Sequence, residues 1–81
     1  MRHLDIIWTE GSDGNIAHLA EHDVSPEEAE EVLREPTSVT TSRRSGRPIA
    51  FDFTSTGRQL AVVYEKIDHV TVYPITAYEI E

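Results

Sequence analysis

The stretch NIAHLAEHDVSPEEAEEVLREP, residues 15–36, carries the clearest local signal in the chain. Ser25 stands at a typical N-cap position, with Pro26 at the first helical position and Glu28 at the third. Such a pair forms a capping box, in which the serine hydroxyl accepts a first-turn N–H and the glutamate accepts the serine N–H. Pro36 disfavours helical geometry at the residue before it. The stretch therefore predicts a helix over residues 26–34.

This helix has one narrow apolar stripe, made of Ala29, Val32 and Leu33. Val24, just before the cap, is expected to pack on Ala29 as a hydrophobic staple. The remaining surface is acidic, and we expect it to face water and to favour the positive helix start. These acidic residues are Glu27, Glu28, Glu30 and Glu31.

Two further elements are expected before this helix. Residues 3–8 alternate as a short strand, and residues 13–22 follow a glycine-containing turn with helical spacing of apolar residues. Only about three residues separate this first helix from the second, which predicts a helical hairpin. The expected buried residues are Leu4, Ile6 and Trp8 on the strand and Ile16, Leu19 and Ala20 on the helix.

After Pro36 the apolar period changes to two, which predicts antiparallel strands over 38–42, 49–54, 60–64 and 69–76. Residues 60–64 are apolar on both faces and are therefore placed centrally in the sheet. Pro74 indicates an edge or a bulge, and Lys66-Ile67-Asp68 is expected to form a turn. In the strand over 49–54, Ile49, Phe51 and Phe53 alternate with Ala50, Asp52 and Thr54. A strand, two helices and a three- to four-stranded meander predict an α+β two-layer sandwich, formed by one domain over residues 1–81.

The composition narrows the classes of function. The 81 residues include no cysteine, which excludes disulfides and thiolate metal sites, and no apolar run approaches the roughly 18 residues of a membrane span. We expect a cytoplasmic protein without cofactor or metal. The net charge is −8, with ten of the fifteen acidic residues in 1–36. This balance argues against long-range attraction to nucleic acid, although Arg43, Arg44 and Arg47 cluster in the second half.

The order of several short motifs resembles the BrnT family of toxins from type II toxin–antitoxin modules, which share the RelE-like fold. The matching segments are Ile7-Trp8, His18 to Leu33, Arg43 and Arg47 around a hairpin, Thr56-Gly57-Arg58 leading into Leu60 to Tyr64, and Thr76-Ala77. The resemblance covers nearly the whole chain. At the position of the family's usual C-terminal arginine this chain has Tyr78, and the family's C-terminal helix is absent.

The resemblance implies a metal-independent RNA endonuclease, neutralised by an antitoxin with a ribbon-helix-helix DNA-binding domain. Metal-free cleavage needs cations that hold the phosphate and a proton acceptor for the 2′-hydroxyl. In this interpretation Arg47 and Arg58 hold the phosphate and Arg43 and Arg44 bind the RNA substrate. The proton acceptor is Tyr64, His22 or Glu65.

Non-catalytic interpretations explain the same residues. Arg58 could pair across strands with Asp52 or Glu65, and the hairpin arginines could pair with the acidic helices of this chain or of a second copy. His18 and His22 have the i, i+4 spacing of metal ligands, but without a third ligand we expect a packed or helix-capping role. Tyr73 and Tyr78 are expected to be sheet formers rather than RNA-stacking residues.

The alternative function is therefore a catalytically inactive BrnT-like interaction module, which binds a partner or forms a homodimer. The acidic balance and the missing C-terminal arginine favour this alternative, whereas the order of the motifs favours the ribonuclease. An exposed sheet edge at residues 38–42 or at the last strand could support dimerisation.

Overall fold

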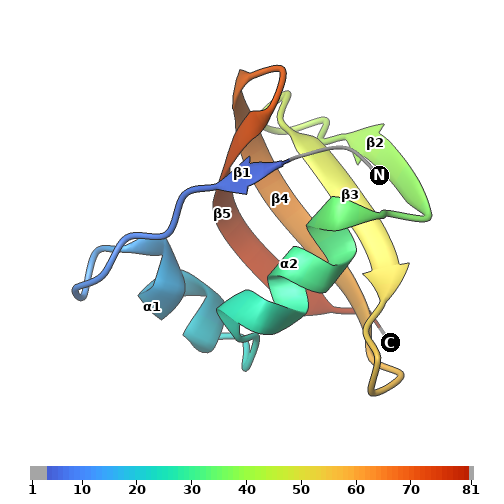
Figure 1. Ribbon diagram of the computed structural model, residues 1–81, viewed down its shortest axis with the longest axis horizontal. Coiled ribbons are helices and arrows are strands. Elements are labelled where there is room, and N and C mark those ends of the chain that lie inside the picture. The colour runs from blue at the N-terminus through green and yellow to red at the C-terminus, as the bar shows by residue number, and fades with distance from the viewer. Residues whose placement is uncertain (1–3, 81) are drawn as a thin grey trace.

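The computed structural model describes residues 4–80, which form two helices and a five-stranded mixed sheet. In chain order the elements are β1 (Asp5–Ile6), α1 (Asn15–Ala20), α2 (Pro26–Arg34), β2 (Ser38–Thr41), β3 (Pro48–Phe53), β4 (Gln59–Asp68) and β5 (Thr71–Glu79). Strands β2 to β5 form an antiparallel meander, and β1 pairs in parallel with β5, giving the order β1-β5-β4-β3-β2. Both helices lie on one face of this sheet (Figure 1), which confirms the α+β class.

The predicted helix over residues 26–34 is present with the predicted bounds. Its capping box is complete: the Glu28 N–H donates to Ser25 Oγ at 3.2 Å, and the Ser25 N–H donates to Glu28 Oε1 at 3.1 Å. Val24 and Ala29 are both buried in the core. The local sequence around the cap therefore fixes where the helix starts and which side of it packs on the sheet.

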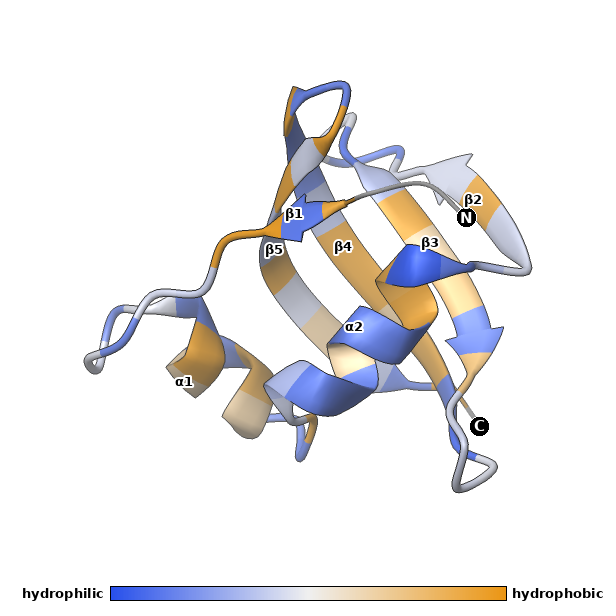
Figure 2. Cartoon of the chain, in the orientation of Figure 1, coloured by the Kyte–Doolittle hydropathy of each residue, from blue (hydrophilic) through white to orange (hydrophobic). Residues whose placement is uncertain are grey.

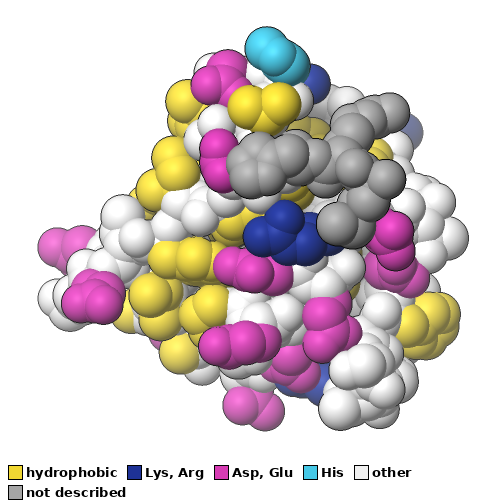
Figure 3. All heavy atoms as spheres, in the orientation of Figure 1, with side chains coloured by type: hydrophobic (Ala, Val, Ile, Leu, Met, Phe, Trp, Pro, Cys, Tyr) yellow, Lys and Arg dark blue, Asp and Glu magenta, His cyan; other side chains and the backbone are white. Residues whose placement is uncertain are grey.

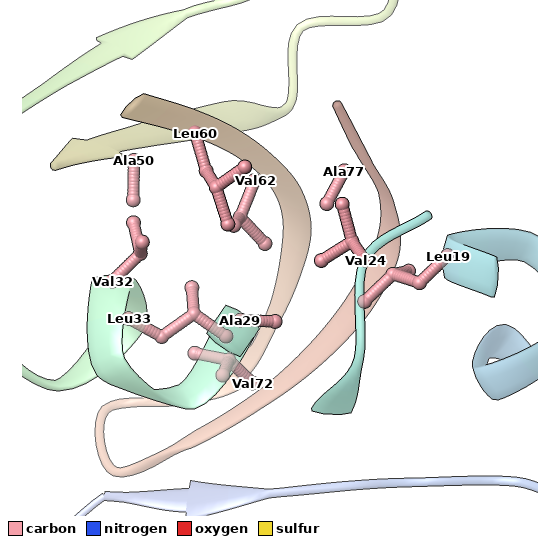
Figure 4. Close-up of a cluster of buried hydrophobic side chains, with 10 residues drawn as sticks. All are labelled: Leu19, Val24, Ala29, Val32, Leu33, Ala50, Leu60, Val62, Val72 and Ala77. Atoms are coloured by element: carbon pink, nitrogen blue, oxygen red, sulfur yellow. The ribbon is translucent and has the colours of Figure 1, made fainter. Parts of the chain in front are cut away.

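The hydrophobic core fills the space between the helices and one face of the sheet (Figure 4). Apolar residues of the two helices and of the loop between them meet small and branched residues of β3, β4 and β5. Burial of these side chains is the main favourable term that holds the two layers together. The core residues are Leu19, Val24, Ala29, Val32, Leu33, Ala50, Leu60, Val62, Val72 and Ala77.

Three glutamates of α2 bind neighbouring segments, and of these Glu28 and Glu30 are half-buried whereas Glu31 is exposed as expected. Glu28 accepts hydrogen bonds from Arg58, Glu30 accepts one from the Trp8 indole N–H at 2.7 Å, and Glu31 accepts one from the Ser55 N–H at 2.6 Å. Figure 2 shows α2 with its hydrophilic residues away from the sheet. The acidic side of α2 therefore fixes the helix to the N-terminal segment and to the β3–β4 turn.

A buried asparagine connects β1, α1 and β5. The Asn15 side chain is 1% exposed, and its amide N–H groups donate to the carbonyls of Ile7 at 2.9 Å and Pro74 at 3.0 Å. Its Oδ1 accepts from the Thr9 N–H at 2.8 Å and from the Thr9 hydroxyl at 3.1 Å. At Gly14, just before α1, an added Cβ would lie 2.3 Å from the Thr9 carbonyl oxygen. The start of α1 is thus held closely against the chain leaving β1.

Several predicted boundaries differ from those observed. The strand predicted over 3–8 comprises only Asp5–Ile6, and residue 3 lies outside the described residues. Helix α1 is shorter than predicted, and Ala20 is exposed rather than buried.

Differences also occur in the sheet. The predicted strand 60–64 is central, as expected, but β4 continues to Asp68, so the turn predicted at 66–68 is wrong. A register shift places Pro74 opposite Tyr64, and this confirms the predicted bulge.

Candidate functional site

The face of the sheet turned away from the helices has no covering layer among residues 4–80. In β3 the buried residue is Ala50, so Ile49, Phe51 and Phe53 lie on this open face, since successive strand residues point to opposite sides. Phe53 is 59% exposed and Tyr78 of β5 is 39% exposed. We call this surface the open face.

The register of the strands places uncharged residues in complete rows across the open face. One row consists of Thr40, Ile49, Val63 and Thr76, and the next consists of Ser38, Phe51, Ala61 and Tyr78. A shorter third row pairs Phe53 with Gln59. Ala61 is fully buried although it lies on this open face, between Phe51 and Tyr78 in the register. The rows therefore form one continuous apolar and uncharged surface.

A cavity of about 240 Å³ lies on the other side of the sheet, where the end of α2 meets the β4–β5 hairpin. The last turn of α2 contributes Leu33 and Arg34, β4 contributes Tyr64 and Lys66, and the hairpin contributes His69. Tyr64 and Lys66 are two residues apart on one strand and so share the face that packs on the helices. The remaining described lining residues are Leu4, Pro36 and Val72.

Basic side chains line this cavity. They are Arg34, Lys66 and His69, and no carboxylate is among the described lining residues. Arg34 is held in place because Nη1 donates to the Leu4 carbonyl at 3.0 Å and Nη2 lies 3.6 Å from Glu30 Oε1. Elsewhere the helix-bearing side of the molecule displays many acidic side chains (Figure 3). The cavity is therefore a local concentration of hydrogen-bond donors on an acidic protein.

Tyr64 belongs to this cavity, and burial raises the pKa of its phenol. A raised pKa keeps the hydroxyl protonated at neutral pH. The Tyr64 hydroxyl is thus a hydrogen-bond donor towards an anion rather than a ready proton acceptor. Of the two other residues proposed as proton acceptor, Glu65 points to the opposite side of β4, and His22 is exposed in the turn after α1.

Arg58 is fixed by the protein itself. Its Nη1 donates to both carboxylate oxygens of Glu28, at 2.9 and 2.8 Å, and to the Asp23 carbonyl at 2.9 Å. Its Nε donates to Glu79 Oε1 at 3.2 Å. The expected cross-strand partners, Asp52 and Glu65, are wrong, since Asp52 instead accepts from Thr37 and from a neighbouring backbone N–H. These contacts leave the Arg58 guanidinium engaged in holding α2 to β4 and β5.

The other predicted arginines lie at the opposite end of β3. Arg47 immediately precedes β3 and Arg58 lies opposite Thr54 beyond its end, so seven residue steps at ~3.3 Å each place their backbones about 23 Å apart. The structure therefore does not bring Arg47 and Arg58 together. Arg43 and Arg44 are exposed in the β2–β3 turn beside Arg47, and within residues 4–80 none of the three forms an ion pair. The expected pairing of these arginines with the chain's own acidic helices is thus not observed.

His18 and His22 are exposed on α1 and on the turn that follows it, so the packed role expected for a histidine here is wrong. Across the described range 4–80, no three His, Asp or Glu side chains are grouped as metal ligands. No described helix is long and apolar enough to cross a membrane.

The chain has no match among protein-family models, curated proteins or solved structures. Its function must be inferred from its own geometry.

Sequence reasoning missed Arg34, Lys66 and His69 as members of one site. Arg34 is more than thirty residues away from Lys66 and His69 along the chain, and the three meet only because β4 continues past the predicted turn. One signal was present: Lys66 follows Tyr64 at the two-residue spacing that puts both side chains on one face of a strand. A charged residue on the core side of a strand is unusual unless it reaches a solvent-filled cavity.

Proposed function

We propose that this protein is a BrnT-like interaction module that self-associates through the open face. The observation that supports this proposal is the continuous uncharged surface formed by the rows of β2 to β5. Large exposed apolar patches on small proteins mark interaction surfaces. A chain of this size buries only about 60% of its unfolded surface, so covering the face also stabilises the fold.

A second copy can approach the open face because the rows of this face carry no charge. Each chain carries a net charge of −8, so two copies repel one another over most of their surfaces. The rows that contain Phe51, Phe53 and Val63 carry no charge and allow close approach. Two such faces can pack as stacked sheets, about 10 Å apart, with their side chains interdigitated.

The test is the molar mass of the purified protein in solution, measured by light scattering after size exclusion. We expect a dimer at about 100 µM, since a micromolar Kd leaves little monomer there. Phe53→Asp places a charge in the open face and should give a monomer. Val39→Asp is the matched control, because Val39 is 51% exposed but faces the opposite side of the sheet, opposite Ala50.

A monomeric wild type, or equal loss of dimer in the Phe53→Asp and Val39→Asp variants, would refute self-association through this face. Circular dichroism of both variants checks that the fold is retained.

The cavity supports a second candidate function, a metal-independent RNA endonuclease of the BrnT type. Lys66, Arg34 and His69 supply cations and titratable nitrogen, and Tyr64 supplies a neutral donor. These are groups that can hold a phosphate and stabilise the charge that develops on it during cleavage. This site differs from the sequence-based one, in which Arg47 and Arg58 act together.

Cleavage of a labelled RNA in EDTA tests this candidate. We expect activity that is lost in His69→Ala and kept in His18→Ala, since His18 is an exposed histidine outside the cavity. An Arg47→Ala variant separates the two sites: loss of activity there, with His69→Ala active, would favour the sequence-based assignment. A folded wild-type protein that cuts no RNA would exclude the enzyme.

A further inference from the structure

We infer that the cavity between the end of α2 and the β4–β5 hairpin binds a small oxyanion carried on an apolar or aromatic body. This inference depends on the geometry of the cavity and on neither proposed function. Its volume of about 240 Å³ equals roughly eight waters at ~30 Å³ each, which is the scale of a small organic acid or phosphate ester.

Four side chains that can donate hydrogen bonds line the cavity. The guanidinium of Arg34, the ammonium of Lys66, the imidazole of His69 and the hydroxyl of Tyr64 all line one cavity. Oxyanions form strong charge-assisted hydrogen bonds with such groups.

These donors differ in how far they are already engaged by other groups of the protein. Lys66 is exposed and makes no ion pair among residues 4–80, so its ammonium group is free to meet a ligand. His69 is also exposed, but it interacts electrostatically with the Asp68 carboxylate. Arg34 keeps one guanidinium edge on the Leu4 carbonyl and lies 3.6 Å from Glu30, a partly exposed pair that holds it in place without a close contact.

Acidic groups next to the cavity accept hydrogen bonds from the protein itself. The Asp68 carboxylate accepts the Val70 N–H at 2.9 Å, and this backbone bond, followed by bonds with Thr71 and attraction to His69, lowers the Asp68 pKa. Asp68 is thus occupied by its own hairpin and is not a lining residue. Glu30, which lies 3.6 Å from Arg34, also accepts the Trp8 indole N–H. The described lining residues include the cations Arg34 and Lys66 and no carboxylate.

Part of the cavity lining is apolar. Leu33 and Val72 belong to the hydrophobic core, and Leu4 packs against it. A free inorganic anion would leave this surface unused, whereas an anion attached to a hydrocarbon or ring would cover it. Small-molecule sites commonly combine apolar walls with a few polar groups that fix orientation.

The experiment is a titration of the full chain with phenyl phosphate, followed by ¹H–¹⁵N NMR. We expect saturable shifts at the amides of residues 33–36 and 64–72. Benzoate in a parallel titration distinguishes a carboxylate source from a phosphate source, since either oxyanion on a ring satisfies the inference. Phenol is the uncharged reference, and it should bind at least about tenfold more weakly, a factor that corresponds to ~1.4 kcal/mol.

Variants assign the binding to the cavity. Lys66→Gln should weaken binding by about tenfold or more, the loss expected for one charge-assisted contact. Arg44→Gln removes the same charge from the exposed β2–β3 turn and should leave the affinity unchanged. Lys66→Arg keeps the cation and should retain binding, which separates a lost contact from a disturbed fold.

The inference is overturned if neither oxyanion gives saturable shifts, if phenol binds as tightly as both, or if Lys66→Gln and Arg44→Gln behave alike. Incubation of the same samples with labelled RNA keeps the result distinct from the ribonuclease proposal. Oxyanion binding without RNA cleavage leaves the inference standing and rejects the enzyme.

Discussion

Asn15 shows how much one buried polar side chain can determine. Its four side-chain hydrogen bonds join Ile7 and Thr9 after β1 to Pro74 in β5, and all of its polar atoms are satisfied. The capping pair Ser25 and Glu28 could be predicted from the sequence because its partners lie three residues apart. Asn15 could not, because its partners lie up to 59 residues away and only the folded chain brings them together.

We predict that Asn15→Ala lowers the free energy of unfolding by about 2–4 kcal/mol, because it leaves buried backbone groups without partners. Urea denaturation followed by the fluorescence of Trp8, the single tryptophan, measures this change. Ser12→Ala, at an exposed position in the adjacent turn, should change the free energy by less than about 0.5 kcal/mol. Equal stability of the two variants would contradict the role given to Asn15.

At the scale of elements, the predicted bounds of α2 agree with the structure at both ends, whereas for β3 the bounds are close but the buried face was not predicted. Local capping chemistry determined the bounds of α2. In β3 the alternation was recognised, but Ile49, Phe51 and Phe53 lie on the open face while the small Ala50 faces the helices. Alternation alone gives two faces and does not say which one the helices cover. In this fold α2 packs on the face of β3 that carries the small residue Ala50.

The ion pair between Glu28 of α2 and Arg58, just before β4, should make the free energy of unfolding depend on pH. The Ser25 N–H, and then Arg58, lower the pKa of Glu28 below its ordinary value of 4.5. The unfolded state therefore binds the proton more readily, so this stabilisation is present above about pH 4.5 and is lost as the pH falls through the lower folded pKa. We predict that Glu28→Gln is destabilising at neutral pH and that its difference from wild type shrinks in acid.

Urea denaturation at a series of pH values between about 3 and 7 measures this difference. Glu27→Gln is the control, because it removes the same charge from the same helical turn but no hydrogen bond to Ser25 or Arg58. A Glu28→Gln difference that is constant across the range would show that the carboxylate charge contributes nothing through these contacts.

At the scale of the whole molecule, the sequence was sufficient for the α+β class and for an antiparallel meander. It was not sufficient for the parallel pairing of β1 with β5, since a two-residue strand carries little pattern of its own. The cavity was missed for a related reason, because it forms where α2 and the β4–β5 hairpin meet. Tyr64 was the only predicted site residue that the fold placed there.

The net charge of −8 gives the proposed dimer a dependence on salt. Added salt shortens the screening distance from about 10 Å at 0.1 M to ~3 Å at 1 M, which weakens repulsion between two acidic copies. We predict that the dimer dissociates less readily as NaCl is raised, measured by sedimentation velocity over a dilution series. The Phe53→Asp variant should stay monomeric under the same conditions. Weaker association at high salt would instead indicate a dimer held by ion pairs.

The parallel pairing of β1 with β5 has a consequence for the order of events during synthesis. Asp5 and Ile6 leave the ribosome 66 residues before their partners Thr71 and Val72. Until then β1 has no sheet edge to join, and Asn15 lacks its bond to Pro74. Contacts between distant segments also slow folding. Strand β1 can therefore join the sheet only after β5 has been translated.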